Sequence, residues 1–386
     1  MPLPLKYHWR NLFVRKVTTT LTVLVIAVVV GTLTWILGFT SALRGALAVA
    51  ADARKVIVLQ RGANSETNSS ISPEEFNRLS QLSGVEIISP ELYWQTQLPR
   101  LRDGGRTRAN VALRGVTEAA FQAHPNVRLL GANLAPGEPQ VLVGQAAAEQ
   151  FQGLEIGASI PLGIGENRQY RVVGYFSAGG GPMESEIWLY LPSMQSAYQR
   201  NGYSSATLRL AEGVAPGPLI EQIGGAAIQL GAQTEREYWS AQTGTIVVYQ
   251  VVCYILVGMM SLAAVFAIAN TMFAMVSGRA REVAMLRTIG YQPRQILTGF
   301  VLESVLLSLL GGVLGVLGCA AWLTWVGRTK DMFGANTFTT MAFEIELTPW
   351  IAGIALAAVA VVGALGALAP ARRAARLQVV AALREA

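Results

Sequence analysis

Residues 244–278 read GTIVVYQVVCYILVGMMSLAAVFAIANTMFAMVSG and contain no charged side chain. A helix needs about 20 apolar residues to cross the hydrocarbon core of a bilayer, and it satisfies its own backbone hydrogen bonds there. The stretch therefore predicts a membrane-spanning helix. Its length exceeds what the bilayer needs, so the helix either projects beyond the membrane surface or tilts within it.

Three further stretches predict spanning helices: residues 17–43, 295–327 and 347–370. Basic residues precede the first stretch, as in a cleavable signal peptide. Its apolar run is longer than the roughly 7–15 residues usual in such leaders, so we expect a retained anchor. The third span contains one acid, Glu303, close to Arg294 at its start. We expect a structural polar contact at Glu303 rather than a proton relay.

Twelve of the 30 Lys and Arg residues gather in three short segments that contain two acids: an amphipathic N-terminus at 1–16, a loop at 279–294 and a tail at 371–386. They are Lys6, Arg10, Arg15, Lys16, Arg279, Arg281, Arg287, Arg294, Arg372, Arg373, Arg376 and Arg384. The positive-inside rule places these segments, and both chain termini, in the cytoplasm. The net charge of +6 thus reflects topology and gives no support to nucleic-acid binding.

The remaining segments, a long one at 44–243 and a loop at 328–346, are expected on the opposite side. Strand patterns at 55–59, 140–143, 171–176, 186–191 and 206–210 alternate with helical patterns at 73–82, 145–151, 192–199 and 216–230. Ser72 and Pro73 are typical of a helix start. We therefore predict a membrane α-helical protein with four transmembrane helices and a large α+β extracytoplasmic domain between the first and second.

Candidate catalytic groups are scarce. His8 and His124 are the two histidines, and Cys253 and Cys319 fall inside predicted spans, so we expect no metal cluster and no disulfide framework. None of the four lysines follows a glycine, as a Walker motif requires.

Five arginines lie close together in the extracytoplasmic segment: Arg100, Arg102, Arg106, Arg108 and Arg114. They indicate a solvated strand face, or alternatively a contact with an anionic partner.

The cytoplasmic loop reads RAREVAMLRTIG at 279–290. Val283, Leu286 and Ile289 fall about three residues apart, which predicts a short amphipathic helix ended by Gly290. The helix either lies on the membrane surface or docks a cytoplasmic partner.

Small residues recur in the third span at Gly311, Gly312, Gly315 and Gly318. This spacing permits close helix contact, either at a dimer seam or within one subunit.

The RAREVAMLRTIG loop, the following Gln295-Ile296, the 303–315 segment and the closing PARRAARLQVVAALR at 370–384 resemble the FtsX-like permeases of MacB-type ABC transporters. In that resemblance the loop is a coupling helix received by a separate ATPase, which binds the ATP and Mg²⁺, so this chain needs no cofactor. The contact candidates it implies are Arg281, Glu282, Leu286, Arg287 and Gly290. Arg281 and Glu282 supply charge pairing and Leu286 an apolar anchor, while Arg287 contacts the ATPase or lipid phosphate.

The resemblance further implies a MacB-like periplasmic core domain at 44–243, with residues 244–278 forming a stalk as well as a span. It implies a non-catalytic homodimer in a bacterial inner membrane that couples ATP hydrolysis by the separate ATPase to a conformational change of the periplasmic domain. This change drives efflux or export with a periplasmic adaptor and an outer-membrane exit duct. Two alternatives stay open: an FtsX-like signalling regulator of a cell-wall hydrolase, and a subunit for lipoprotein extraction like LolC and LolE.

Overall fold

A computed structural model of the chain describes residues 16–50, 52, 54–101, 104–242, 244–325, 345 and 347–376. The chain forms two compact units: a helical unit of residues 1–41, 247–327 and 345–386, and a mixed unit of residues 42–246 and 328–344. Three expected segments fall largely outside the described residues: 1–16 apart from Lys16, 328–346 apart from Ile345, and the tail after Arg376.

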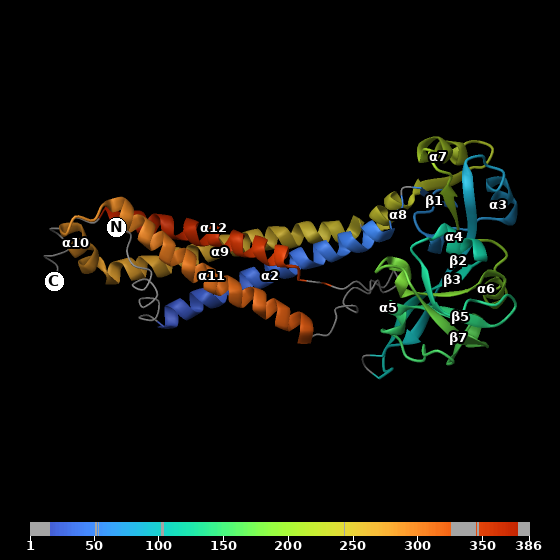
Figure 1. The fold of residues 1–386 in the computed structure, drawn as a ribbon, viewed down its shortest axis with the longest axis horizontal. Helices are drawn as coiled ribbons and strands as arrows, with labels where there is room; N and C mark the ends of the chain where they lie inside the picture. The colour runs from blue at the N-terminus through green and yellow to red at the C-terminus, as the bar shows by residue number, and fades with distance from the viewer. Residues whose placement is uncertain are drawn as a thin grey trace. The chain divides into compact units, whose positions relative to one another are not determined.

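In the described part of the chain, four long helices are apolar and long enough to cross a membrane: α2 (Lys16–Ala50), α9 (Gly244–Gly278), α11 (Pro293–Trp325) and α12 (Pro349–Ala375) (Figure 1). The α+β domain lies in the chain between α2 and α9. The predicted fold class is therefore confirmed.

Small residues let the helices of this unit approach closely. A Cβ atom on Gly311 would lie 2.8 Å from Ile26 of α2, and one on Gly315 would overlap the carbonyl oxygen of Ala27. Gly312 packs in the same way against Val359 of α12, while Gly318 has no such neighbour within 4 Å. Three of the four predicted glycines thus make close contacts inside the chain, and a dimer seam at Gly318 stays a prediction.

The mixed unit contains the strands β1 (Lys55–Gln60), β2 (Val85–Pro99), β3 (Arg108–Val116), β4 (Arg128–Gly131), β5 (Gln140–Gly144), β6 (Ser159–Leu162), β7 (Arg168–Ser177), β8 (Glu186–Tyr190), β9 (Ser205–Leu210) and β10 (Leu230–Thr234). Its helices are α3 (Pro73–Leu79), α4 (Glu118–Ala123), α5 (Gln145–Ala148), α6 (Leu191–Tyr198), α7 (Pro216–Gly224) and α8 (Glu235–Gln242), with 3-10 turns η1 (Glu66–Asn68), η2 (Ile164–Glu166) and η3 (Pro182–Ser185).

The strands form a mixed sheet in the order β10-β1-β9-β2-β3-β8-β5-β7-β4, with β6 also paired to β7. The long strand β2 joins two halves of the sheet: Val85–Glu91 pair with β9, and Leu92–Pro99 pair with β3. One apolar core packs around β1, β9 and α7, and two others pack around β3, β5, β7 and β8. Glu91 therefore lies where β2 passes from one half to the other.

All nine predicted elements of this unit are present, and three of the four helices are shorter than expected. The helix expected at 216–230 ends at Gly224, which is followed by another glycine, and β10 begins at Leu230. Ser72 caps α3 as expected: its hydroxyl accepts from the Glu75 amide at 3.2 Å, and Glu75 accepts from the Ser72 amide at 2.8 Å. The strands β2, β3, β4, β6 and β10 were not predicted.

Candidate functional site

The loop between α9 and α11 forms a helix, α10 (Ala280–Thr288), as the sequence predicts. Arg279 leaves helical geometry at the end of α9 and so starts a new axis. At the other end Gly290 adopts φ +101°, a left-handed conformation that glycine adopts without strain, and the Tyr291 amide donates to the Leu286 carbonyl at 3.1 Å. The chain then enters α11 at Pro293.

One face of α10 packs onto the helical unit. Val283 and Ala284 are buried, and Val283 joins a cluster with Ile296, Phe300 and Ala371. Arg287 is half-buried, and its Nη1 lies 3.5 Å from the Ala375 carbonyl oxygen. This face therefore fixes α10 against the membrane helices.

The opposite face is exposed. It carries Arg281, Glu282 and Thr288 together with two apolar side chains, Met285 (55% exposed) and Ile289 (70% exposed). Residues three and four apart share one side of a helix, so these five form a continuous surface. An exposed apolar pair beside an arginine and an acid fits both locations expected for this helix, a protein contact and the membrane surface. We call these five residues the α10 face.

The expected apolar stripe of Val283, Leu286 and Ile289 is not a single face. Val283 is buried, Leu286 is half-buried, and Ile289 lies just after the helix on the exposed side. Met285 was not among the predicted contact residues, although its spacing of four from Ile289 indicates a shared helix face.

Glu303 makes a polar contact next to α10. The Nη1 atom of Arg279 lies 3.1 Å from both carboxylate oxygens of Glu303, which is 1% exposed. The neighbouring Ser304 hydroxyl donates to the Gly363 carbonyl of α12 at 2.8 Å. An acid inside an apolar helix is costly unless paired, so this ion pair ties the start of α10 to α11.

Two family descriptions match the chain. "MacB-like periplasmic core domain" covers residues 19–226, and "FtsX-like permease C-terminal" covers residues 254–379, which include α10. Neither is a nucleotide-binding domain.

The chain is also similar to curated proteins of two kinds. It is 28% identical over 216 residues to a macrolide export ATP-binding/permease protein, MacB 2, of Aeromonas hydrophila, covering 53% of this chain and 31% of that protein. It is 23% identical over 209 residues to the lipoprotein-releasing system transmembrane protein LolC of Xylella fastidiosa, covering 50% of this chain and 49% of LolC. The matched part thus spans less than half the length of either relative.

Among solved structures, the periplasmic region of MacB from Actinobacillus actinomycetemcomitans aligns with a TM-score of 0.37 at 13% identity, covering 48% of this chain and 91% of that one.

Proposed function

Because the chain belongs to the FtsX-like permeases with a MacB-like periplasmic core domain, we propose that it is the membrane subunit of an ABC transporter whose ATPase is a separate polypeptide. As a member of this family it is a multi-pass membrane protein with a periplasmic domain. The ATP and Mg²⁺ are bound by the partner, and this chain contributes no cofactor site. The cytoplasmic membrane of a bacterium, with both termini inside, is the location that the charge distribution supports.

The observation that carries the proposal is the α10 face. Met285 and Ile289 are two large apolar side chains, each more than half exposed, that lie four residues apart and beside charged side chains. Exposed apolar patches rimmed by polar residues mark contacts with proteins or membranes, and we assign this one to the ATPase. In our proposal Met285 and Ile289 enter an apolar cleft of the ATPase, while Arg281 and Glu282 pair with charges at its rim. Leu286 packs behind this pair, and Arg287 holds α10 on the membrane helices.

The same geometry offers a route for motion. The turn at Arg279 joins α10 directly to α9, which continues without a break for 35 residues, or about 50 Å, to Gly244. Because a bilayer core is about 30 Å thick, α9 is long enough to span it and extend beyond it. A shift of α10 by the ATPase would therefore move a single rigid element that leads into the periplasmic domain.

We propose that this motion drives export, with two copies of the chain, a periplasmic adaptor and an outer-membrane exit duct. Lipoprotein release is the second candidate, and the similarity to LolC over half of the chain favours it. An adaptor recovered with the complex supports export, whereas release of lipoproteins from the membrane by the complex supports the second candidate. A cell-wall hydrolase recovered instead supports the regulatory alternative.

The test is purification of the tagged chain from its native host in mild detergent, followed by mass spectrometry of co-purifying proteins. The variant is Met285→Ser with Ile289→Ser, and the matched control is Gln292→Ala in the same loop. We expect an ABC ATPase with the wild type and the control, and its loss with the double variant. An ATPase that the double variant retains would overturn the role of the α10 face, and absence of any ATPase after crosslinking would overturn the proposal.

A further inference from the structure

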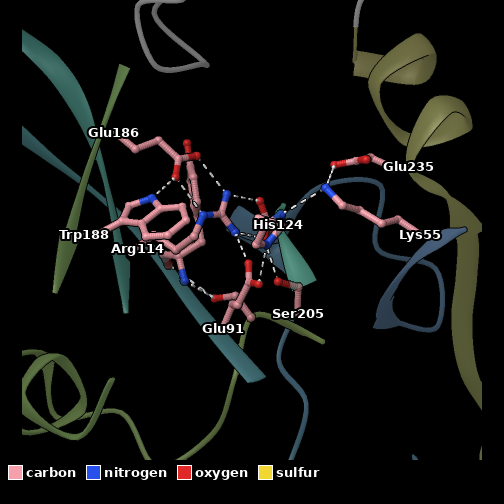
Figure 2. Close-up of polar contacts among 11 residues, drawn as sticks. Lys55, Glu91, Arg114, His124, Glu186, Trp188, Ser205 and Glu235 are labelled. Carbon is pink, nitrogen blue, oxygen red and sulfur yellow. Dashed lines mark hydrogen bonds and ion pairs between the residues drawn. The ribbon is translucent and has the colours of Figure 1, made fainter. Parts of the chain in front are cut away.

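A buried cluster of charges lies in the periplasmic domain, centred on Arg114 of β3 (Figure 2). The guanidinium donates to Glu66 at 2.7 and 2.9 Å, to Glu91 at 2.6 Å and to Glu186 at 2.7 and 2.8 Å. Burial opposes the charge of Arg114, but the three carboxylates outweigh it and raise the pKa of the guanidinium well above its usual value. The guanidinium is therefore a permanent cation with its N–H groups used on three acids.

A chain of contacts runs from this cluster to Lys55 and Glu235. Glu91 accepts from Arg114 with one oxygen, and its other oxygen lies 2.8 Å from Nε2 of His124. The opposite ring nitrogen, Nδ1, lies 3.2 Å from Nζ of Lys55, which also donates to Glu235 at 3.2 Å. All five side chains are at most 2% exposed, so the folded domain shields them from bulk water.

The hydrogen-bond chemistry assigns the proton of His124. An ionised carboxylate only accepts, so the Nε2 that faces Glu91 must carry the hydrogen. An ammonium only donates, so the Nδ1 that faces Lys55 must be unprotonated and accept its hydrogen bond. A doubly protonated imidazole would direct an N–H at the ammonium, and two like charges 3.2 Å apart in a buried site repel strongly.

We propose that one proton controls the hydrogen bond between Lys55 and His124, and we call this contact the joint. The joint is closed, with the hydrogen bond formed, while the imidazole is the neutral Nε2–H form. It opens when Nδ1 takes up a second proton. The joint lies close in the chain to two of the membrane helices. Lys55 is the first residue of β1, the strand that follows α2, and Glu235 is the first residue of α8, the helix that precedes α9. His124 and Glu91 lead to Arg114, which connects the two halves of the sheet. Acidification outside the cell would then loosen the tie between the helix-adjoining segments and the rest of the domain.

The groups that face the imidazole from each packed element support this assignment. Lys55 on β1 and Glu91 on β2 contact it directly, and the Trp188 ring on β8 lies 6.0 Å from it. The next charged groups on the Glu91 side are Arg114, Glu66 and Glu186, and the next on the Lys55 side is Glu235. Arg209 on β9 donates to the carbonyl of Gln122 in α4. Lys55 is thus the cation that directly opposes a second proton.

The chain offers a direct measurement, because it has two histidines. Replacing His8 by Gln leaves His124 as the one imidazole in the full-length protein. Selective ¹⁵N-histidine labelling in lipid nanodiscs then reports its tautomer by NMR. Hydrogen exchange over β1 and α4 reports whether the joint is closed, and it is measured on the same sample and corrected for intrinsic rates.

We expect the Nε2–H form at pH 8. On titration towards pH 5, appearance of the doubly protonated ring should coincide with exchange in β1 that is about tenfold faster or more, since a hydrogen bond to a charged group is lost. His124→Gln can still donate to Glu91 and accept from Lys55 but takes up no proton, so its exchange should not respond to pH. With Lys55→Met, more doubly protonated imidazole should be present at each pH.

An Nδ1–H tautomer or a doubly protonated ring at pH 8 would overturn the proposal. So would protonation of His124 without faster exchange in β1. None of these measurements involves the ATPase, so they test the joint independently of the proposed transport function.

Discussion

Replacing Arg114 by Leu should severely destabilise the periplasmic domain. The substitution leaves Glu66, Glu91 and Glu186 buried, each at most 5% exposed, without the cation that pairs them. Removing one partner of a buried ion pair costs about 3–5 kcal/mol, and three carboxylates lose theirs here. A domain of this size is stable by about 5–15 kcal/mol, so the variant should retain little stability.

The assay is hydrogen exchange over β3 and β8 in the full-length protein. A loss of about 3 kcal/mol corresponds to exchange faster by roughly two orders of magnitude. The matched control is Arg108→Leu, because Arg108 pairs with Glu166 on the surface, where both side chains are 47% exposed. Such pairs contribute about 0–1 kcal/mol, so exchange in the control should change little.

A second variant separates lost pairing from poor packing. When Arg114→Leu is combined with Gln at Glu66, Glu91 and Glu186, the unpaired charges are gone, and most of the lost protection should return. Wild-type protection in Arg114→Leu alone would refute the account of the cluster. Failure of the combined variant to recover would show that the guanidinium acts through its shape and not its charge.

Three further predictions follow from other contacts. Burial raises the pKa of Glu91, but Arg114 and His124, which is doubly protonated at acid pH in our proposal, outweigh burial and lower this pKa from 4.5 to about 2. In that acid window the depressed pKa stabilises the fold by about 3 kcal/mol at pH 4.5, and this is lost as pH falls towards 2, so the melting temperature should drop between pH 4.5 and 2 in the wild type and less in Glu91→Gln. Gly315→Leu should force α2 from α11 and cost about 1–3 kcal/mol or more in thermal unfolding, whereas Gly318→Leu on the same helix should have little effect. Ser72→Ala should cost about 1 kcal/mol, seen as faster exchange in α3, because the Glu75 amide loses its acceptor, and unchanged exchange there would contradict the capping role.

The membrane helices could be predicted because lipid imposes one simple requirement, a long run without charge, and residues 244–278 meet it with no exception. The helix cap at Ser72 and the helix end at Gly290 could also be predicted, because each depends on residues that are neighbours in the sequence. β2 and β3 could not be predicted in this way. The burial of β2 does not alternate along the strand, because β2 crosses from one half of the sheet to the other and packs differently on each side.

The charge cluster was out of reach for a different reason. Glu91, Arg114 and Glu186 lie on β2, β3 and β8, which are brought together by strand pairing, and Glu66 reaches them from the turn η1. Arg114 was expected on a solvated strand face with its neighbouring arginines, and it is instead 1% exposed. That expectation was wrong for Arg114, whereas Arg106 and Arg108 are exposed as expected and Arg102 lies outside the described residues. The density of charges along the chain does not show which arginine of a basic run pairs with buried acids.

The measurement that tests the central claim most directly is site-specific photocrosslinking in living cells. A photoreactive residue at Ile289 on the α10 face should crosslink to an ABC ATPase, and the same residue at Ile156, which is 58% exposed in the periplasmic domain, should not. Crosslinks from position 289 to lipid alone, or ATPase crosslinks from position 156, would contradict both the coupling role of α10 and the proposed topology.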